Sequence, residues 1–298
     1  MLFSIIIFFG QVKIYAMAYW GVLLAILLSF TGNDSKKTFE RQLPEEKYSY
    51  IIYYDFIGKI NKEDSTKKVN ERMMLLSGQS MSKYLSYNKF LADSMIMDQY
   101  KNPKMINGAP SFSAQGIPKP KVNHQVTKDF STNTYKFNNV LGVNYYVFSE
   151  NLPDLQWKLE TDEKQLLGYK CQKATAHFSG RDYIAWFTSA IPIPDGPYKF
   201  SGLPGLILEI TDTKGDYKFI AVGLETVNKT ITTKPFGSNL KELKSSNDYK
   251  TIYKKFKSNP GPFFEPDNMK LPPELIERAA KNATDMLQYH NNPLELDE

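Results

Sequence analysis

The feature that most constrains the fold is a dense succession of short apolar and aromatic runs, each bounded by turn residues, between positions 135 and 225. Such runs fit the pleated, half-buried surface of a sheet, where β-branched and aromatic side chains are enriched. Asp212–Asp216 is a turn-rich centre between two of the runs, which is typical of a hairpin. The expected strands are Tyr48–Ile60, Arg72–Leu76, Met81–Leu85, Tyr135–Val140, Val143–Ser149, Gln156–Glu160, Leu166–Phe178, Tyr183–Thr188, Leu206–Thr211, Tyr217–Glu225 and Lys229–Thr233.

Three other stretches favour helices. Residues 88–100 predict a short one, and residues 249–256 place apolar side chains at i, i+3, i+4 and i+7. Pro272-Pro273 then opens another apolar stripe, because proline is tolerated in the first turn of a helix. The expected fold class is therefore mainly β (α+β): a curved antiparallel sheet or half-barrel with a few covering helices, two of them near the C-terminus.

Residues 1–30 are expected to target or anchor the protein. They hold two apolar runs and a single charge, Lys13, before a polar switch at Thr31, as in a secretory signal peptide. The second run, of about 17 residues, is at the short limit for crossing a bilayer, so an uncleaved inner-membrane anchor stays open. The one cysteine, Cys171, is far from this segment, so a lipoprotein is not expected. We expect a periplasmic or secreted envelope protein, with membrane contact through residues 1–30 if they are retained.

The rest of the chain is expected to form one domain. Residues 31–47 are polar and charged and predict a linker, and 48–298 follow as a single unit. Within that unit, prolines and glycines break any apolar period in 101–133, which predicts a long irregular loop. Residues 247–290 are expected to be a helical tail.

Charge argues against a nucleic-acid partner. The net charge is +5, and the lysines are scattered among Glu and Asp without forming a basic stripe. A mixed, solvated surface accounts for the same charges.

The most informative motif lies in residues 196–207, where Gly-Leu-Pro-Gly-Leu-Ile follows an upstream Gly-Pro. Pro204 and Gly205 predict a type II turn, since proline fixes φ at the first central position and glycine accepts a positive φ at the second. Gly202 is expected to let the entering chain approach another backbone, and Leu206 begins a core strand. The motif residues are Gly196, Pro197, Gly202, Leu203, Pro204, Gly205, Leu206 and Ile207.

This block closely resembles the GLPGLI family, which takes its name from the hexapeptide. Residues 167–174, Gly180-Arg181, residues 185–188 and residues 191–193 are similar to that family's approach to the motif, and the resemblance spans about residues 48–230. The resemblance implies an exported envelope protein of diderm bacteria. It implies no particular reaction or ligand, because none is established for the family.

Residues with reactive side chains give no catalytic pattern. Cys171 and His177 fall on one face of an expected strand but about 20 Å apart at 3.3 Å per residue, so they could not touch within it. His124 could reach Cys171 only through the tertiary fold. The histidines, His290 included, lack metal-ligand spacing, and Met95 and Met97 would diverge on a helix. We expect no metal and no cofactor.

Three side chains are candidate ligand contacts, namely Trp157, Arg181 and Trp186, which suit an anion or a sugar face. The alternative is that the tryptophans are core residues and Arg181 lies at a hairpin rim. The leading hypothesis is a non-catalytic envelope protein that binds a hydrophobic ligand, a peptide or an envelope partner. An envelope hydrolase with an unrecognised site and an accessory partner of an outer-membrane transporter remain alternatives.

Overall fold

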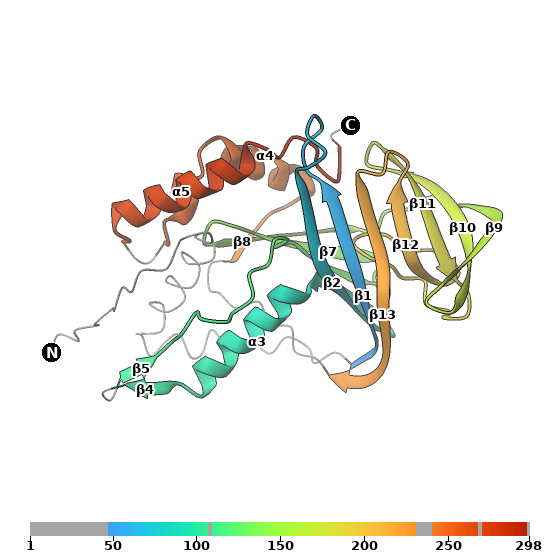
Figure 1. Ribbon diagram of the computed structural model, residues 1–298, viewed down its shortest axis with the longest axis horizontal. Coiled ribbons are helices and arrows are strands. Elements are labelled where there is room, and N and C mark those ends of the chain that lie inside the picture. Colours follow the sequence, from blue (N-terminus) through green and yellow to red (C-terminus); the bar gives the residue numbers. More distant parts are fainter. Residues whose placement is uncertain (1–46, 107–108, 231–239, 268–269, 297–298) are drawn as a thin grey trace.

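The computed structural model describes residues 47–106, 109–230, 240–267 and 270–296 (Figure 1). Residues 1–46, which contain the expected signal peptide or anchor and nearly all of the linker, lie outside them. The strands are β1 (Lys47–Lys59), β2 (Lys68–Gly78), β3 (Met81–Ser86), β4 (Lys104–Ile106), β5 (Ala109–Ser111), β6 (Gln125–Asp129), β7 (Thr134–Leu141), β8 (Asn144–Asn151), β9 (Lys158–Leu166), β10 (Tyr169–Phe178), β11 (Arg181–Thr188), β12 (Leu206–Asp212), β13 (Tyr217–Thr230) and β14 (Leu240–Glu242). The helices are α3 (Tyr87–Lys101), α4 (Ser246–Ser258), the 3₁₀ helix η2 (Gly261–Phe264) and α5 (Pro273–Leu287).

Twelve of these strands form one sheet in the order β14-β8-β7-β6-β3-β2-β1-β13-β12-β11-β10-β9. Neighbouring strands are antiparallel, except that β14 pairs with β8 in parallel. In Figure 1 the sheet bends strongly, and β7 and β8 pass across β1, β2 and β13. Within the described residues the end strands β9 and β14 do not pair with each other, so the sheet stays open. The predicted fold class is confirmed.

Strand β1 shows how alternation shapes the two faces of the sheet. Ile52, Tyr54 and Phe56 point to one side, which we call the inner face, and join the largest buried cluster. Ile51 belongs to a separate cluster on the opposite side, against which Tyr87 and Phe90 of α3 pack. Because successive side chains in a strand alternate between faces, one strand supplies both cores.

The inner face is covered by the chain itself. The connection between β11 and β12, residues 189–205, lays Ile191, Tyr198, Phe200 and Leu203 on the sheet, and each is at most 6% exposed. Side chains from β1 to β3, β6 to β8 and β10 to β13 join the same cluster. The connection therefore covers the inner face with buried side chains of the same chain.

The two C-terminal helices pack against the β7–β8 end of the sheet. Ala279, Ala283 and Leu287 of α5, spaced one turn apart, meet Phe256 of α4 and Phe264 of η2. Ser245 caps α4 by accepting a hydrogen bond from the backbone N–H of Asp248, and α5 begins with proline, as predicted. None of the helices in the described residues is long and apolar enough to cross a bilayer.

The prediction of one irregular loop over 101–133 is wrong in part. β4 and β5 form a small hairpin there, and β6 is a full member of the large sheet. β6 was missed because its inward-facing residues include Lys128, and lysine is a residue type that is almost never fully buried. The expected strand Leu166–Phe178 also divides, since Leu167 and Gly168 turn with positive φ between β9 and β10. Of the strand expected at Lys229–Thr233, Lys229 and Thr230 end β13, and 231–233 lie outside the described residues.

Candidate binding site

The motif residues occupy the end of the β11–β12 connection and the start of β12. Leu203, Leu206 and Ile207 are buried in the inner-face core, whereas Pro204 is exposed. The hydroxyl of Tyr54 donates to the carbonyl of Ile207 at 2.6 Å, which ties the motif to the middle of the sheet. Burial of the motif's apolar side chains gives most of it a structural role.

The predicted type II turn at Pro204-Gly205 is not formed. Gly202 rather than Gly205 has a positive φ, of 94°, and the N–H of Gly205 bonds to the carbonyl of Leu203, as in a compact three-residue turn. Gly205 is needed for another reason: a Cβ there would lie 2.1 Å from the carbonyl oxygen of Thr188. The roles expected for the two glycines are therefore exchanged: Gly202 adopts the positive φ, and Gly205 allows the close approach of the β11 backbone.

A buried ion pair anchors the same connection. Nζ of Lys128 lies 2.5 Å from Oδ1 of Asp195, and both side chains are 0% exposed. The ammonium also donates to the carbonyls of Gly196 and Phe200, and the carboxylate accepts from Ser77 and from the N–H of Gly196. Burial lowers the pKa of Lys128, and the nearby Asp195 carboxylate opposes this. Three acceptors match the three donors of an ammonium, so the pair fixes the connection onto β6.

A second cation, Lys199, lies in an aromatic surround. Its side chain is 5% exposed, and Nζ is 2.6 Å from a carboxylate oxygen of Glu295. Nζ also sits 4.7 Å from the ring centre of Tyr135 and 5.4 Å from that of Tyr198, within cation–π range. The hydroxyl of Tyr198 donates to the same Glu295 oxygen at 2.6 Å. Tyr198 has φ 55°, a conformation rare for a residue with a side chain, so its surroundings hold it there.

His124 borders this cluster. Its ring stacks on Phe137 and meets Tyr198 edge-on, with ring centres 5.8 and 5.4 Å apart. Burial first, and the charge of Lys199 second, lower the pKa of His124 to about 4. The imidazole is therefore neutral at pH 7, and it serves as a packing surface beside Lys199.

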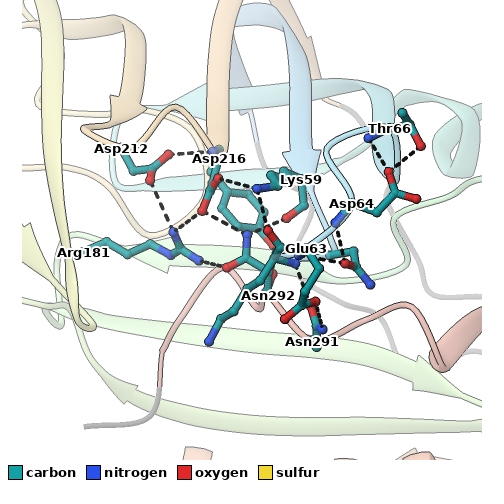
Figure 2. A network of polar contacts seen from close by, with 12 residues as sticks. Lys59, Glu63, Asp64, Thr66, Arg181, Asp212, Asp216, Asn291 and Asn292 are labelled. Atoms are coloured by element: carbon teal, nitrogen blue, oxygen red, sulfur yellow. Dashed lines mark hydrogen bonds and ion pairs between the residues drawn. The ribbon is translucent and has the colours of Figure 1, made fainter.

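Arg181 is another buried cation, and Figure 2 shows it pointing at Asp212, Asp216 and Asn292. Nη1 lies 3.3 Å from Asp212 and 3.4 Å from Asp216, and the guanidinium stacks over the ring of Tyr217. Its remaining donors bind the chain segment that follows α5. These bonds go to the Asn292 side chain and to the backbone carbonyls of residues 293 and 294.

That segment, residues 291–296, crosses the edge of the inner face from Arg181 to Lys199. Backbone N–H groups of Asn291 and Asn292 bond to the carbonyl of Ile60, and the N–H of Leu296 bonds to the carbonyl of Ser179. We call the surface beneath it, formed by Lys59, Arg181, Tyr198, Lys199 and Tyr217, the segment groove.

The three predicted ligand contacts do not come together. Trp157 donates its indole N–H to the carbonyl of Ser201 and lies beside Gly202, so it braces the motif. Trp186 lies under the ammonium of Lys164, on the face of β11 opposite to Arg181, since five residues separate them along the strand. Arg181 is buried rather than at an exposed rim.

The reactive residues also stay apart from one another. Cys171 is fully buried, and burial raises the pKa of its thiol, which is the reverse of what a nucleophile needs. His177 pairs with Asp182 across the β10–β11 hairpin on an exposed surface. Over the described part of the chain, no group of three or more His, Cys, Asp or Glu side chains is placed to hold a metal ion.

Sequence reasoning missed Lys128, Asp195, Lys199 and Glu295. One signal was available for Lys128, because alternation from Val126 would turn it inward if 125–129 were a strand. The partners that Lys199 and Arg181 find in residues 292–295 lie about a hundred residues further along the chain, where no local pattern marks them.

Comparison with known proteins supplies a family model but no activity. A model described as "Protein of unknown function (Porph_ging)" matches residues 178–209, which contain β11, the connection and the whole hexapeptide. Among solved structures, PNGF-II in two crystal forms gives TM-scores of 0.48 and 0.47 at 15% and 16% identity. The match covers 70% of this chain and 33% of the PNGF-II chain, so this chain spans about a third of its length. No curated protein matches this chain.

Proposed function

We propose that the protein is an exported, non-catalytic component of the bacterial cell envelope, similar to the GLPGLI family, and that it binds an envelope protein partner at its surface. The hexapeptide at 202–207 and the apolar opening of residues 1–30 support the family and the export. The alternatives to a protein partner are a hydrophobic ligand held in the sheet and a hydrolytic site.

The observation that carries the proposal is the filling of the inner face. Tyr198, Phe200 and Leu203 are at most 5% exposed where a hydrophobic ligand would sit in an open half-barrel. A protein core is packed as densely as an organic crystal, so a ligand could bind there only if the β11–β12 connection moved away from the sheet. A partner bound at the surface leaves the core intact.

The buried charges support a binding role rather than catalysis. Lys128 and Arg181 are held by carboxylates and carbonyl groups of the chain itself. The thiol of Cys171 is enclosed in the core. The two cations stabilise the β11–β12 connection and the segment groove. They are not arranged around an accessible nucleophilic side chain, as catalysis would require.

The test has two parts. Fractionation of a diderm bacterium expressing the full chain should place it in the envelope, and full-length protein in the cytosol would refute export. Affinity capture from native envelope, with mass spectrometry of both lipids and proteins, should enrich protein. Enrichment of one lipid class at a fixed ratio to the protein would instead support the hydrophobic-ligand alternative.

A further inference from the structure

Residues 291–296 belong to no helix or strand, and the chain bends at Asn292, Leu294 and Glu295. The rest of the molecule binds this segment as a receptor binds a short peptide. In Figure 1 the chain leaves α5 and runs past the ends of β1 and β13, outside the large sheet's hydrogen-bond ladder. Much of its anchorage comes from receptor side chains that bind its main chain. Arg181 donates hydrogen bonds to the carbonyl groups of Pro293 and Leu294 at 2.8 and 3.1 Å. The hydroxyl of Tyr217 donates one to the carbonyl of Asn292. Such contacts recognise the backbone of the segment whatever its side chains.

Two side chains of the segment add specificity. Asn292 is 3% exposed, and its amide oxygen accepts from Arg181 at 2.7 Å. Its amide nitrogen donates to the carbonyl of Lys59 at 2.7 Å and to Asp216 at 3.0 Å. A carboxylate here would lose both donated bonds and face Asp216, so the position selects a primary amide. Figure 2 shows this convergence.

The second specific position is Glu295, three residues further on. Its carboxylate meets the ammonium of Lys199 and the hydroxyl of Tyr198. Among the residues that the structure describes, Glu295 is the carboxylate in ion-pair contact with Lys199. Glu150, which is bonded to Tyr135, also interacts electrostatically with Lys199 but forms no ion pair with it among the described residues. Because a buried ammonium without a counter-ion is costly, an occupant of the groove that brings an anion to this point is favoured.

The groove residues also have partners outside the segment. Arg181 is positioned by Asp212, Asp216 and the ring of Tyr217, all on the sheet or its turn. Lys199 lies four residues after Asp195 in the β11–β12 connection, which the buried ion pair of Asp195 with Lys128 holds in place. The segment between these points is less deeply held, since Pro293 is exposed and Leu294 is half-buried against the core.

We infer that the segment groove is a binding site for a short acidic peptide of a partner protein, which replaces residues 291–296 and follows the same bent path. The ligand carries a primary amide at Arg181, an apolar residue two positions later and a carboxylate at Lys199, the pattern Asn-x-apolar-Glu. This inference rests on the proposed function and names the chemistry of its partner.

The test uses the purified full chain and a labelled peptide with the sequence of residues 290–298, His-Asn-Asn-Pro-Leu-Glu-Leu-Asp-Glu. Fluorescence anisotropy compares the parent protein with the double variant Asn292→Ala, Glu295→Gln, whose own segment is weakened. We expect the double variant to bind the peptide at least tenfold more tightly than the parent. A peptide carrying the same two substitutions should bind at least tenfold more weakly than the native peptide.

Equal affinity for the two peptides, or no saturable binding by a double variant with native circular dichroism, would overturn the inference. If the double variant does not fold, Glu295→Gln alone takes its place. This single variant should also bind the native peptide more tightly than the parent does, and the substituted peptide more weakly than the native one. A shift to dimers with loss of peptide binding would also overturn it, in favour of segment exchange between two copies. Because the assay uses purified protein, a negative result leaves the envelope location and a partner surface elsewhere untouched.

Discussion

The two glycines of the motif make opposite demands, and this can be measured. Gly205→Ala would put a Cβ 2.1 Å from the carbonyl oxygen of Thr188 and 2.6 Å from its carbon. An ordinary carbon–oxygen contact is about 3.3 Å or longer, so β11 and the motif have to separate by about 1 Å. Both neighbours are backbone, and neither can rotate away. Overpacking of this kind costs about 1–3 kcal/mol or more, and weakening one or two adjacent hydrogen bonds adds about 0.5–1.5 kcal/mol each.

Gly202→Ala tests the other demand. A Cβ there meets nothing closer than the Trp157 ring at 3.9 Å, so the cost is the positive φ alone, about 1–2 kcal/mol. Gly168→Ala is a matched control, because that glycine also has a positive φ and nothing within 4 Å. Gly202→Asn should cost less than Gly202→Ala, since asparagine adopts positive φ more readily.

Urea and thermal melts of the four variants provide the assay. Gly205→Ala should lose about 2–5 kcal/mol, and each kcal/mol lowers Tm by roughly 2–4 °C in a domain of this size. Gly202→Ala and Gly168→Ala should lose similar, smaller amounts, and Gly202→Asn should lose the least. If Gly205→Ala melts like the parent protein, or if Gly202→Ala is the more damaging change, the steric explanation of Gly205 is refuted.

Three further outcomes are expected. Lys128→Met should cost about 3–5 kcal/mol in denaturant melts because it strands the buried carboxylate of Asp195, whereas Lys164→Met, at a partly exposed pair, should cost less than about 1 kcal/mol. Folded His124 has a pKa of about 4, below its ordinary 6.5, so the unfolded chain takes up a proton first as the pH falls. Stability should therefore be full above pH 6.5 and decline toward pH 4, and His124→Gln should lessen that decline; an unchanged pH profile would contradict this. Native Cys171 should react with a thiol reagent at pH 7 far more slowly than the unfolded chain, and equal rates would show that its thiol is not enclosed.

The fold class could be predicted from the sequence because its signals are local. Apolar alternation in β1 and β11 reports which side chains face a core, and Asp212–Asp216 marks a hairpin through its turn residues. The C-terminal helices are likewise predicted by the spacing of their own apolar residues, such as Ala279 and Ala283. None of these inferences requires knowing which strands become neighbours.

The segment groove and the roles of the glycines could not be predicted in this way. Arg181 and Leu294 are 113 residues apart in the sequence, and Tyr198 and Glu295 are 97 apart. Whether a buried cation finds its counter-charge depends on strand order and register, which local propensity does not encode. Gly205 shows the same limit at close range, since its neighbour is the backbone of another strand. The sequence by itself determined most of the strands, the Asp212–Asp216 hairpin and the helices, because those follow from neighbouring residues. Only the tertiary structure decided which charges meet, because distant segments come into contact only when the sheet is assembled.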